Sequence, residues 1–141
     1  MLAAFPAAGC RSVPPPRFDT RQPGWGVRQG QAIWLPKRGE QELAGDLLWV
    51  TNGKGSGLLQ FGKPSIPLVT VTWEGDAWWF EIPPRHSHYQ GQGKPPGRVA
   101  WLQLARALTG RPVDSRWRWE TLPDNRWRLE SRAGGERLEG Y

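Results

Sequence analysis

Two histidines flank a serine at His86, Ser87 and His88, and these residue types occur in hydrolase and metal sites. A tetrahedral metal site would need a third and a fourth ligand, and no Asp or Glu lies close by in the sequence. In an extended segment Ser87 would point away from both histidines, which does not suit a Ser–His–acid triad. We therefore predict loop residues here, with neither a catalytic nor a metal-binding role.

The segment from Gly53 to Gly57 has the glycine, lysine and serine content of a phosphate-binding loop. Its order differs from the G-x-x-x-x-G-K-[ST] pattern, and no helix is predicted after it, so we predict a hairpin turn. Paired carboxylates for glycoside hydrolysis would have to come from Glu74, Asp76 and Glu81, and the first two fall in a predicted turn. We therefore expect a protein that is not an enzyme and has no cofactor.

The single cysteine, Cys10, follows Ala7, Ala8 and Gly9, and this order resembles the lipobox of bacterial lipoproteins. In a lipobox, small residues precede a cysteine that is acylated and becomes the mature N-terminus. Here no charged residue precedes Cys10, and Ala7 stands where leucine is usual. We predict a truncated signal segment over residues 1–10 with Cys10 as the lipidation site. The alternative is an unmodified thiol in a disordered tail.

Residues 11–30 are rich in proline and arginine and are predicted to form a tether. The run Pro14–Pro16 favours a stiff, extended backbone. An ordinary disordered leader is the alternative. The remaining residues, 31–141, have the length of a single domain. No apolar run in the sequence reaches the roughly 20 residues of a membrane-spanning helix.

Tryptophan is unusually frequent, with 10 among 141 residues. A packed core draws more on Leu, Ile and Val, so this abundance favours an aromatic-lined binding cavity. The alternative for each residue is a place in a solid core. The apolar faces of the predicted elements would supply the cavity residues Trp73, Trp78, Phe80, Trp101, Leu104, Leu108, Trp117 and Trp119.

Alternating apolar and polar residues predict about seven or eight strands. These predicted strands cover residues 42–51, 58–61, 68–73, 77–82, 116–121, 126–130 and 136–141, while residues 85–96 are predicted to form a long loop. Strands with one apolar and one charged face are typical of an antiparallel sheet with one wet side.

One segment, residues 98–108, has the period of a helix. Trp101, Leu104, Ala105 and Leu108 follow the i, i+3, i+4, i+7 spacing of one helix face. Gly110 after it is a typical helix end. We therefore predict a mainly β fold, with a strongly curved antiparallel sheet, or half-barrel, and this helix packed against its concave face.

This pattern resembles the outer-membrane lipoprotein receptor LolB and related half-barrel lipoprotein carriers. The resemblance rests on the strand–turn–strand of residues 47–61, with its Thr-Asn and Gly-Ser turn. It also rests on the helix VAWLQLARALTG at residues 99–110, and on the Trp-rich strands of residues 126–141, which flank a Gly-rich turn and end on Gly-Tyr. Together these parts cover about residues 42–141.

The resemblance implies a lipid-anchored monomer on the periplasmic face of the outer membrane in a Gram-negative-type bacterium. Such a domain binds or hands over acyl chains or lipidated proteins, with a periplasmic lipoprotein carrier and the inner leaflet as partners. The family has a protruding hydrophobic residue in the loop that matches residues 53–55, where this chain has Lys54. We expect this loop to face the membrane or a partner.

Two other classes of binding protein remain open. Adjacent Trp78 and Trp79 would fit a carbohydrate- or cell-wall-binding β module, because one of the two must be exposed unless both faces of the strand are covered. The formal net charge of +6 and the alternation of Arg with Trp at residues 116–119 would fit a domain that binds single-stranded nucleic acid. That alternation, however, places arginine and tryptophan on opposite faces.

Overall fold

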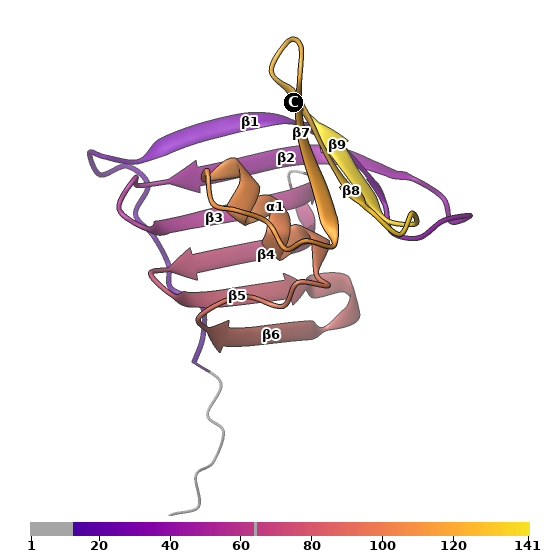
Figure 1. The fold of residues 1–141 in the computed structure, drawn as a ribbon. Helices are drawn as coiled ribbons and strands as arrows, with labels where there is room; N and C mark the ends of the chain where they lie inside the picture. The colour runs from indigo at the N-terminus through magenta and orange to yellow at the C-terminus, as the bar shows by residue number, and fades with distance from the viewer. Residues whose placement is uncertain (1–12, 64) are drawn as a thin grey trace, which may run out of the picture.

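A computed structural model describes residues 13–63 and 65–141, so the predicted lipidation site Cys10 lies outside the described residues. Within them the chain forms one antiparallel sheet of nine strands and one α-helix, α1 (Figure 1). The strands follow one another across the sheet in the order β6-β5-β4-β3-β2-β1-β9-β8-β7. Their bounds are β1 Gly26–Leu35, β2 Leu43–Thr51, β3 Ser56–Lys63, β4 Ile66–Glu74, β5 Ala77–Ile82, β6 Ser87–Gln92, β7 Trp117–Leu122, β8 Arg126–Ser131 and β9 Arg137–Gly140.

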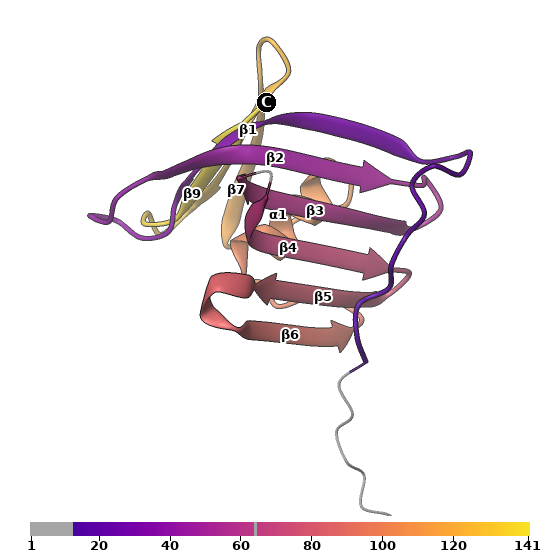
Figure 2. The same cartoon turned by 180° about the vertical axis from the view of Figure 1, so that it is seen from behind.

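The sheet is curved and does not close into a barrel. Strands β7, β8 and β9 turn over the face on which α1 lies, while β6 forms the opposite edge (Figures 1 and 2). This architecture confirms the predicted fold class of a curved antiparallel sheet with one helix. The described residues contain nine strands, against the seven or eight expected.

Two strands, β1 and β6, had no counterpart in the sequence prediction. Strand β1 starts at Gly26, inside the segment that we predicted as a tether, and pairs with both β2 and β9. The predicted long loop at residues 85–96 is wrong, because Ser87–Gln92 forms β6 and pairs with β5 along its length. Residues 26–31 of β1 and the whole of β6 are polar or glycine-rich, so no apolar alternation marks them in the sequence. Backbone pairing with neighbouring strands places them in the sheet.

Helix α1 (Ala100–Leu108) lies on the inner face of the sheet, as predicted. The indole of Trp101 is 1% exposed. Its ring centroid lies 4.9 Å from that of Phe61 on β3 and 5.5 Å from that of Trp34 on β1. Trp101 therefore fills the centre of the curved sheet.

The two ends of α1 are held by the loops on either side. Gln103 is 1% exposed. Its amide Nε2 donates to the carbonyl of Pro96 at 3.3 Å, and its Oε1 accepts the backbone N–H of Asp114 at 2.8 Å. At the other end Gly110 has φ of 76°, which ends the helix as predicted. These contacts fix the helix along its axis.

Residues 13–25 cross the ends of β5, β4 and β3 on the side away from α1 (Figure 2). The Trp79 indole Nε1 donates to the carbonyl of Val13 at 2.9 Å. Val50 and Thr72 belong to the same cross-strand row as Trp79. Both are only 3% exposed, although they face away from the helix. The N-terminal segment therefore covers the outer face of the sheet at this end.

Candidate functional site

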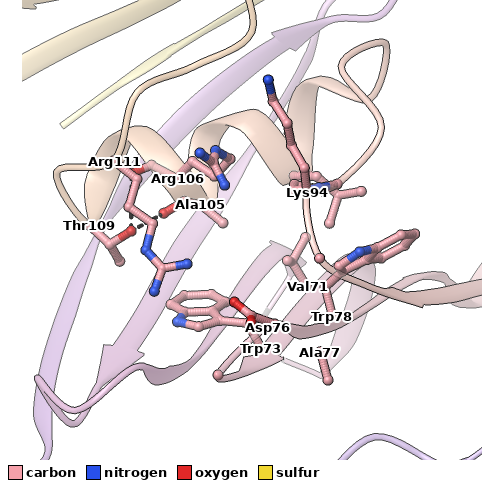
Figure 3. Close-up of a pocket in the computed structure, with 14 residues that line it drawn as sticks. Val71, Trp73, Asp76, Ala77, Trp78, Lys94, Ala105, Arg106, Thr109 and Arg111 are labelled. Carbon is pink, nitrogen blue, oxygen red and sulfur yellow. Dashed lines mark hydrogen bonds between the residues drawn. The ribbon is translucent and has the colours of Figure 1, made fainter.

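A pocket of about 410 Å³ opens between the C-terminal half of α1 and the hairpin of β4 and β5 (Figure 3). Ligand pockets commonly fall between about 300 and 1,000 Å³. Its apolar walls come from the sheet and from the helix, and they comprise Val71, Trp73, Ala77, Trp78, Leu102 and Ala105. Polar residues at the mouth are Asp76, Lys94, Arg106, Thr109 and Arg111.

The floor of the pocket is a cross-strand row with two tryptophans at its centre. Trp73 on β4 and Trp78 on β5 are direct partners, and their outer neighbours are Gly57 on β3 and Gly91 on β6. A Cβ atom on Gly91 would lie 2.5 Å from Cζ2 of Trp78, and one on Gly57 would collide with the Trp73 ring. The Trp73 ring therefore lies over Gly57 on β3, and the Trp78 ring lies over Gly91 on β6.

The helix end places arginine over this floor. The N–H of Gly110 donates to the carbonyl of Ala107 at 3.1 Å, and the N–H of Arg111 donates to that of Arg106 at 2.8 Å. These two bonds form a Schellman motif, which fixes the backbone just after the helix. Figure 3 shows the Arg111 side chain reaching from the helix end towards the Trp73 ring.

The mouth of the pocket is positively charged. Lys94, Arg106 and Arg111 contribute three cations, against the single carboxylate of Asp76. Between residues 13 and 141, position 64 aside, none of these cations forms an ion pair. An anionic group at the mouth would therefore meet cationic side chains that are not already paired with carboxylates.

A second pocket, of about 340 Å³, shares Trp73, Thr109 and Arg111 with the first. Leu108 and the turn that carries Lys54 lie beside it. The Asn52 side-chain oxygen accepts the N–H of Lys54 at 2.8 Å and that of Ser56 at 3.1 Å. Both pockets, and the exposed Lys54, therefore lie at the same end of the molecule.

The structure separates the eight predicted cavity residues into three groups. Trp73 and Trp78 line the main pocket, and Leu108 lines the second. Trp119 is half-buried and stacks on Trp127, with ring centroids 5.9 Å apart. The others are buried in the core, at 0–7% exposure, and these are Phe80, Trp101, Leu104 and Trp117.

Sequence reasoning missed the cations Lys94 and Arg111 and the helix residue Leu102. Lys94 follows β6, which was predicted as part of a loop, and Arg111 follows a helix whose end was predicted but whose position over the sheet was not. Leu102 falls off the expected helix face. A usable signal was present in the glycines, because Gly57 and Gly91 each lie in a strand opposite a tryptophan. A glycine inside a strand often marks the close approach of another group.

The residues that the sequence analysis placed in turns and loops lie in turns or on the surface of the structure. The hairpin turn predicted at Gly53 to Gly57 lies at residues 52–55, because Ser56 and Gly57 already belong to β3. Gly75 turns the chain between β4 and β5. His86 and His88 are exposed, with His88 on the edge strand β6.

In the part of the chain that the structure describes, no group of three His, Cys, Asp or Glu residues is placed to hold a metal ion. None of its helices has the length and hydropathy to span a membrane.

The arginines and tryptophans of β7 and β8 lie on opposite faces of the sheet. Trp117 and Trp127 are buried, whereas Arg118 and Arg126 are exposed. On the outer side, Arg128 pairs with Glu139 at 3.2 Å and with Glu120 at 3.9 Å. These strands therefore present no surface where arginine and stacking aromatic rings meet.

No protein-family model matches the chain, and the search of curated proteins finds no match either.

Proposed function

We propose that this domain binds the acyl chain of a lipid or of a lipidated protein in the pocket between α1 and the β4–β5 hairpin. The observation that carries the proposal is an apolar pocket floored by Trp73 and Trp78 and open to solvent through a cationic mouth. Each methylene group that leaves water contributes about 0.8 kcal/mol. The cost of ordering the ligand offsets part of this gain.

The proposal includes a place in the cell envelope. An acylated Cys10 would anchor the domain to the periplasmic face of the outer membrane, in line with the resemblance to the LolB family. The formal net charge of +6 would favour contact with anionic head groups. Val13 lies beside Trp79 at the end of the sheet near the β4–β5 turn. An anchor at Cys10 would thus hold the pocket end close to the bilayer.

The anchor is tested separately from the pocket. The protein is expressed in a Gram-negative host from its natural gene, with the codons upstream of Met1 included, and the intact mass of the membrane-bound protein is measured beside that of Cys10→Ser. We expect an acyl mass on the wild-type protein and release of the variant from the membrane fraction. An unmodified wild-type protein would contradict the anchor and leave the pocket proposal standing.

The pocket is tested with residues 11–141. Native mass spectrometry shows whether an acyl ligand co-purifies, and tryptophan fluorescence then follows a titration with dodecanoate. We expect a saturable change in fluorescence, because Trp73 and Trp78 line the site. An apo mass with no fluorescence response would overturn the proposal.

Carbohydrate binding is a second candidate, favoured by the flat ring of Trp73 beside the polar groups of Arg111 and Asp76 (Figure 3). An aromatic floor with a few polar groups is a common design for a ligand site. Titration with a cell-wall oligosaccharide tests this candidate. A saturable response to the oligosaccharide, with none to dodecanoate, would favour it over acyl binding.

A further inference from the structure

We propose that the pocket selects long-chain carboxylates, with the carboxylate held at the cationic mouth and the chain lying on Trp73 and Trp78. This inference rests on the proposed function and names the ligand class for the same site. It assigns a recognition role to Arg111, supported by Arg106 and Lys94. A fatty acid is the simplest ligand of this kind.

Charge complementarity is the first argument. Three cations from separate places in the sequence line one apolar pocket, and Asp76 is the only carboxylate among the pocket residues that the structure describes. Arg111 reaches towards the Trp73 ring, whereas the Lys94 amine points away from the two tryptophan rings (Figure 3). Lys94 comes from the loop after β6, Arg106 from the helix and Arg111 from the loop after the helix. An anionic head group balances this charge, while a neutral head group leaves it without a partner.

The rigidity of the mouth is the second argument. The Arg111 backbone is held by its bond to the Arg106 carbonyl at 2.8 Å. The Arg106 Nε donates to the carbonyl of Pro112 at 2.9 Å, which leaves its terminal nitrogens for a ligand. The fixed backbone of Arg111 and the tethered side chain of Arg106 reduce the freedom that these donors lose when they bind an anion.

Most carbonyl groups at the C-terminal end of α1 are already paired, which reduces their repulsion of an anion at the mouth of the pocket. The Thr109 hydroxyl donates to the carbonyl of Ala105 at 2.8 Å, and the N–H groups of Gly110 and Arg111 cap the carbonyls of Ala107 and Arg106. Three of the last four carbonyl groups of α1 therefore already have donors within the chain. The guanidinium of Arg111 and its neighbours dominate the charge at the mouth.

The test compares dodecanoate with dodecan-1-ol, two ligands that have the same alkyl chain and different head groups. Both are used below the concentration at which they aggregate. Tryptophan fluorescence measures Kd for the wild-type protein, for Arg111→Gln and for the control Arg118→Gln on the outer face of β7. We expect dodecanoate to bind the wild type about tenfold more tightly than dodecan-1-ol, since charge-assisted hydrogen bonds are the stronger ones. Arg111→Gln should remove most of this difference, and Arg118→Gln should preserve it.

Salt provides a second measurement that needs no variant. Added salt screens exposed charges, so it should weaken dodecanoate binding and leave dodecan-1-ol binding nearly unchanged. If Arg111→Gln does not fold, Lys94→Gln on the exposed loop replaces it, with an expected loss of a few-fold in dodecanoate affinity. Equal binding of both ligands by the wild type would overturn the head-group contact and leave acyl binding intact. Binding of neither ligand would overturn the proposed function itself.

Discussion

Gly91 on β6 leaves room for the Trp78 indole on the floor of the pocket. A Cβ atom at this position would lie 2.5 Å from the ring, and the three atoms nearest to it all belong to the Trp78 side chain. We expect Gly91→Ala to displace the ring and to weaken acyl binding by about tenfold, at a stability cost of about 1 kcal/mol. Fluorescence titration and urea denaturation measure the two effects.

The matched control is Gly26→Ala at the start of β1. A Cβ atom there would lie 3.9 Å from the carbonyl oxygen of Thr51, at ordinary contact distance. This variant should bind dodecanoate like the wild type. An unchanged affinity in Gly91→Ala as well would show that the position of Trp78 does not shape the site.

The protonation of Glu136 is coupled to folding. Its carboxylate accepts the Trp34 indole N–H at 2.9 Å. Burial raises the pKa of Glu136 above its ordinary value of 4.5, and the bond from Trp34 offsets this rise in part. The folded protein therefore holds this proton more tightly than the unfolded chain, so the contribution to stability is present below pH 4.5 and is lost as the pH rises through the raised pKa.

The variant Glu136→Gln keeps an oxygen that can accept the Trp34 N–H and removes the titration. We expect it to flatten the fall in the free energy of unfolding as the pH rises from acid towards neutral. Urea denaturation at a series of pH values measures this, with Glu120→Gln on the outer side of β7 as the control. Parallel pH profiles for the wild type and Glu136→Gln would contradict the assignment.

At the scale of elements, Gln103 joins α1 to the loops before and after it. A leucine there would leave the carbonyl of Pro96 and the N–H of Asp114 without their side-chain partner. We expect Gln103→Leu to lower the free energy of unfolding by about 2 kcal/mol, because buried polar groups that lose a partner bear the full desolvation cost. Urea denaturation measures the loss, and Gln90→Leu on the exposed edge strand serves as the control.

The segment of residues 13–25 behaves as a cover of the outer face of the sheet. Trp79→Phe keeps an aromatic ring and removes the donor to the Val13 carbonyl. We expect a loss of about 1 kcal/mol in stability and faster trypsin cleavage after Arg17 and Arg21. Limited proteolysis followed by mass spectrometry measures the cleavage. Identical cleavage rates in Trp79→Phe and the wild type would show that this bond does not hold the segment.

At the scale of the whole molecule, Trp101 joins the helix to the curved sheet. It contacts Trp34 on β1 and Phe61 on β3 and is almost fully buried. We expect Trp101→Ala to cost about 3–5 kcal/mol, a large part of the stability of a typical domain. Circular dichroism and urea denaturation measure the loss. A variant as stable as the wild type would contradict the central place of this residue.

Local patterns in the sequence were sufficient to predict the helix and the strands in which apolar and polar residues strictly alternate. The spacing of Trp101, Leu104 and Leu108 predicted a helix, and Gly110 predicted its end, because both depend on neighbours within one or two turns. The turn at residues 52–55 was also predictable from its glycines. The curved, mainly β architecture followed from these elements together.

Tertiary structure alone decided which aromatic residues form the core and which form the pocket. An apolar face has the same alternation whether a helix covers it or leaves it open, so Trp78 and Trp117 look alike in the sequence. Strand β6 exists because β5 pairs with it, and Arg111 reaches Trp73 because the end of α1 lies over β4. These outcomes depend on contacts between residues far apart in the chain, and no local pattern of side chains specifies them.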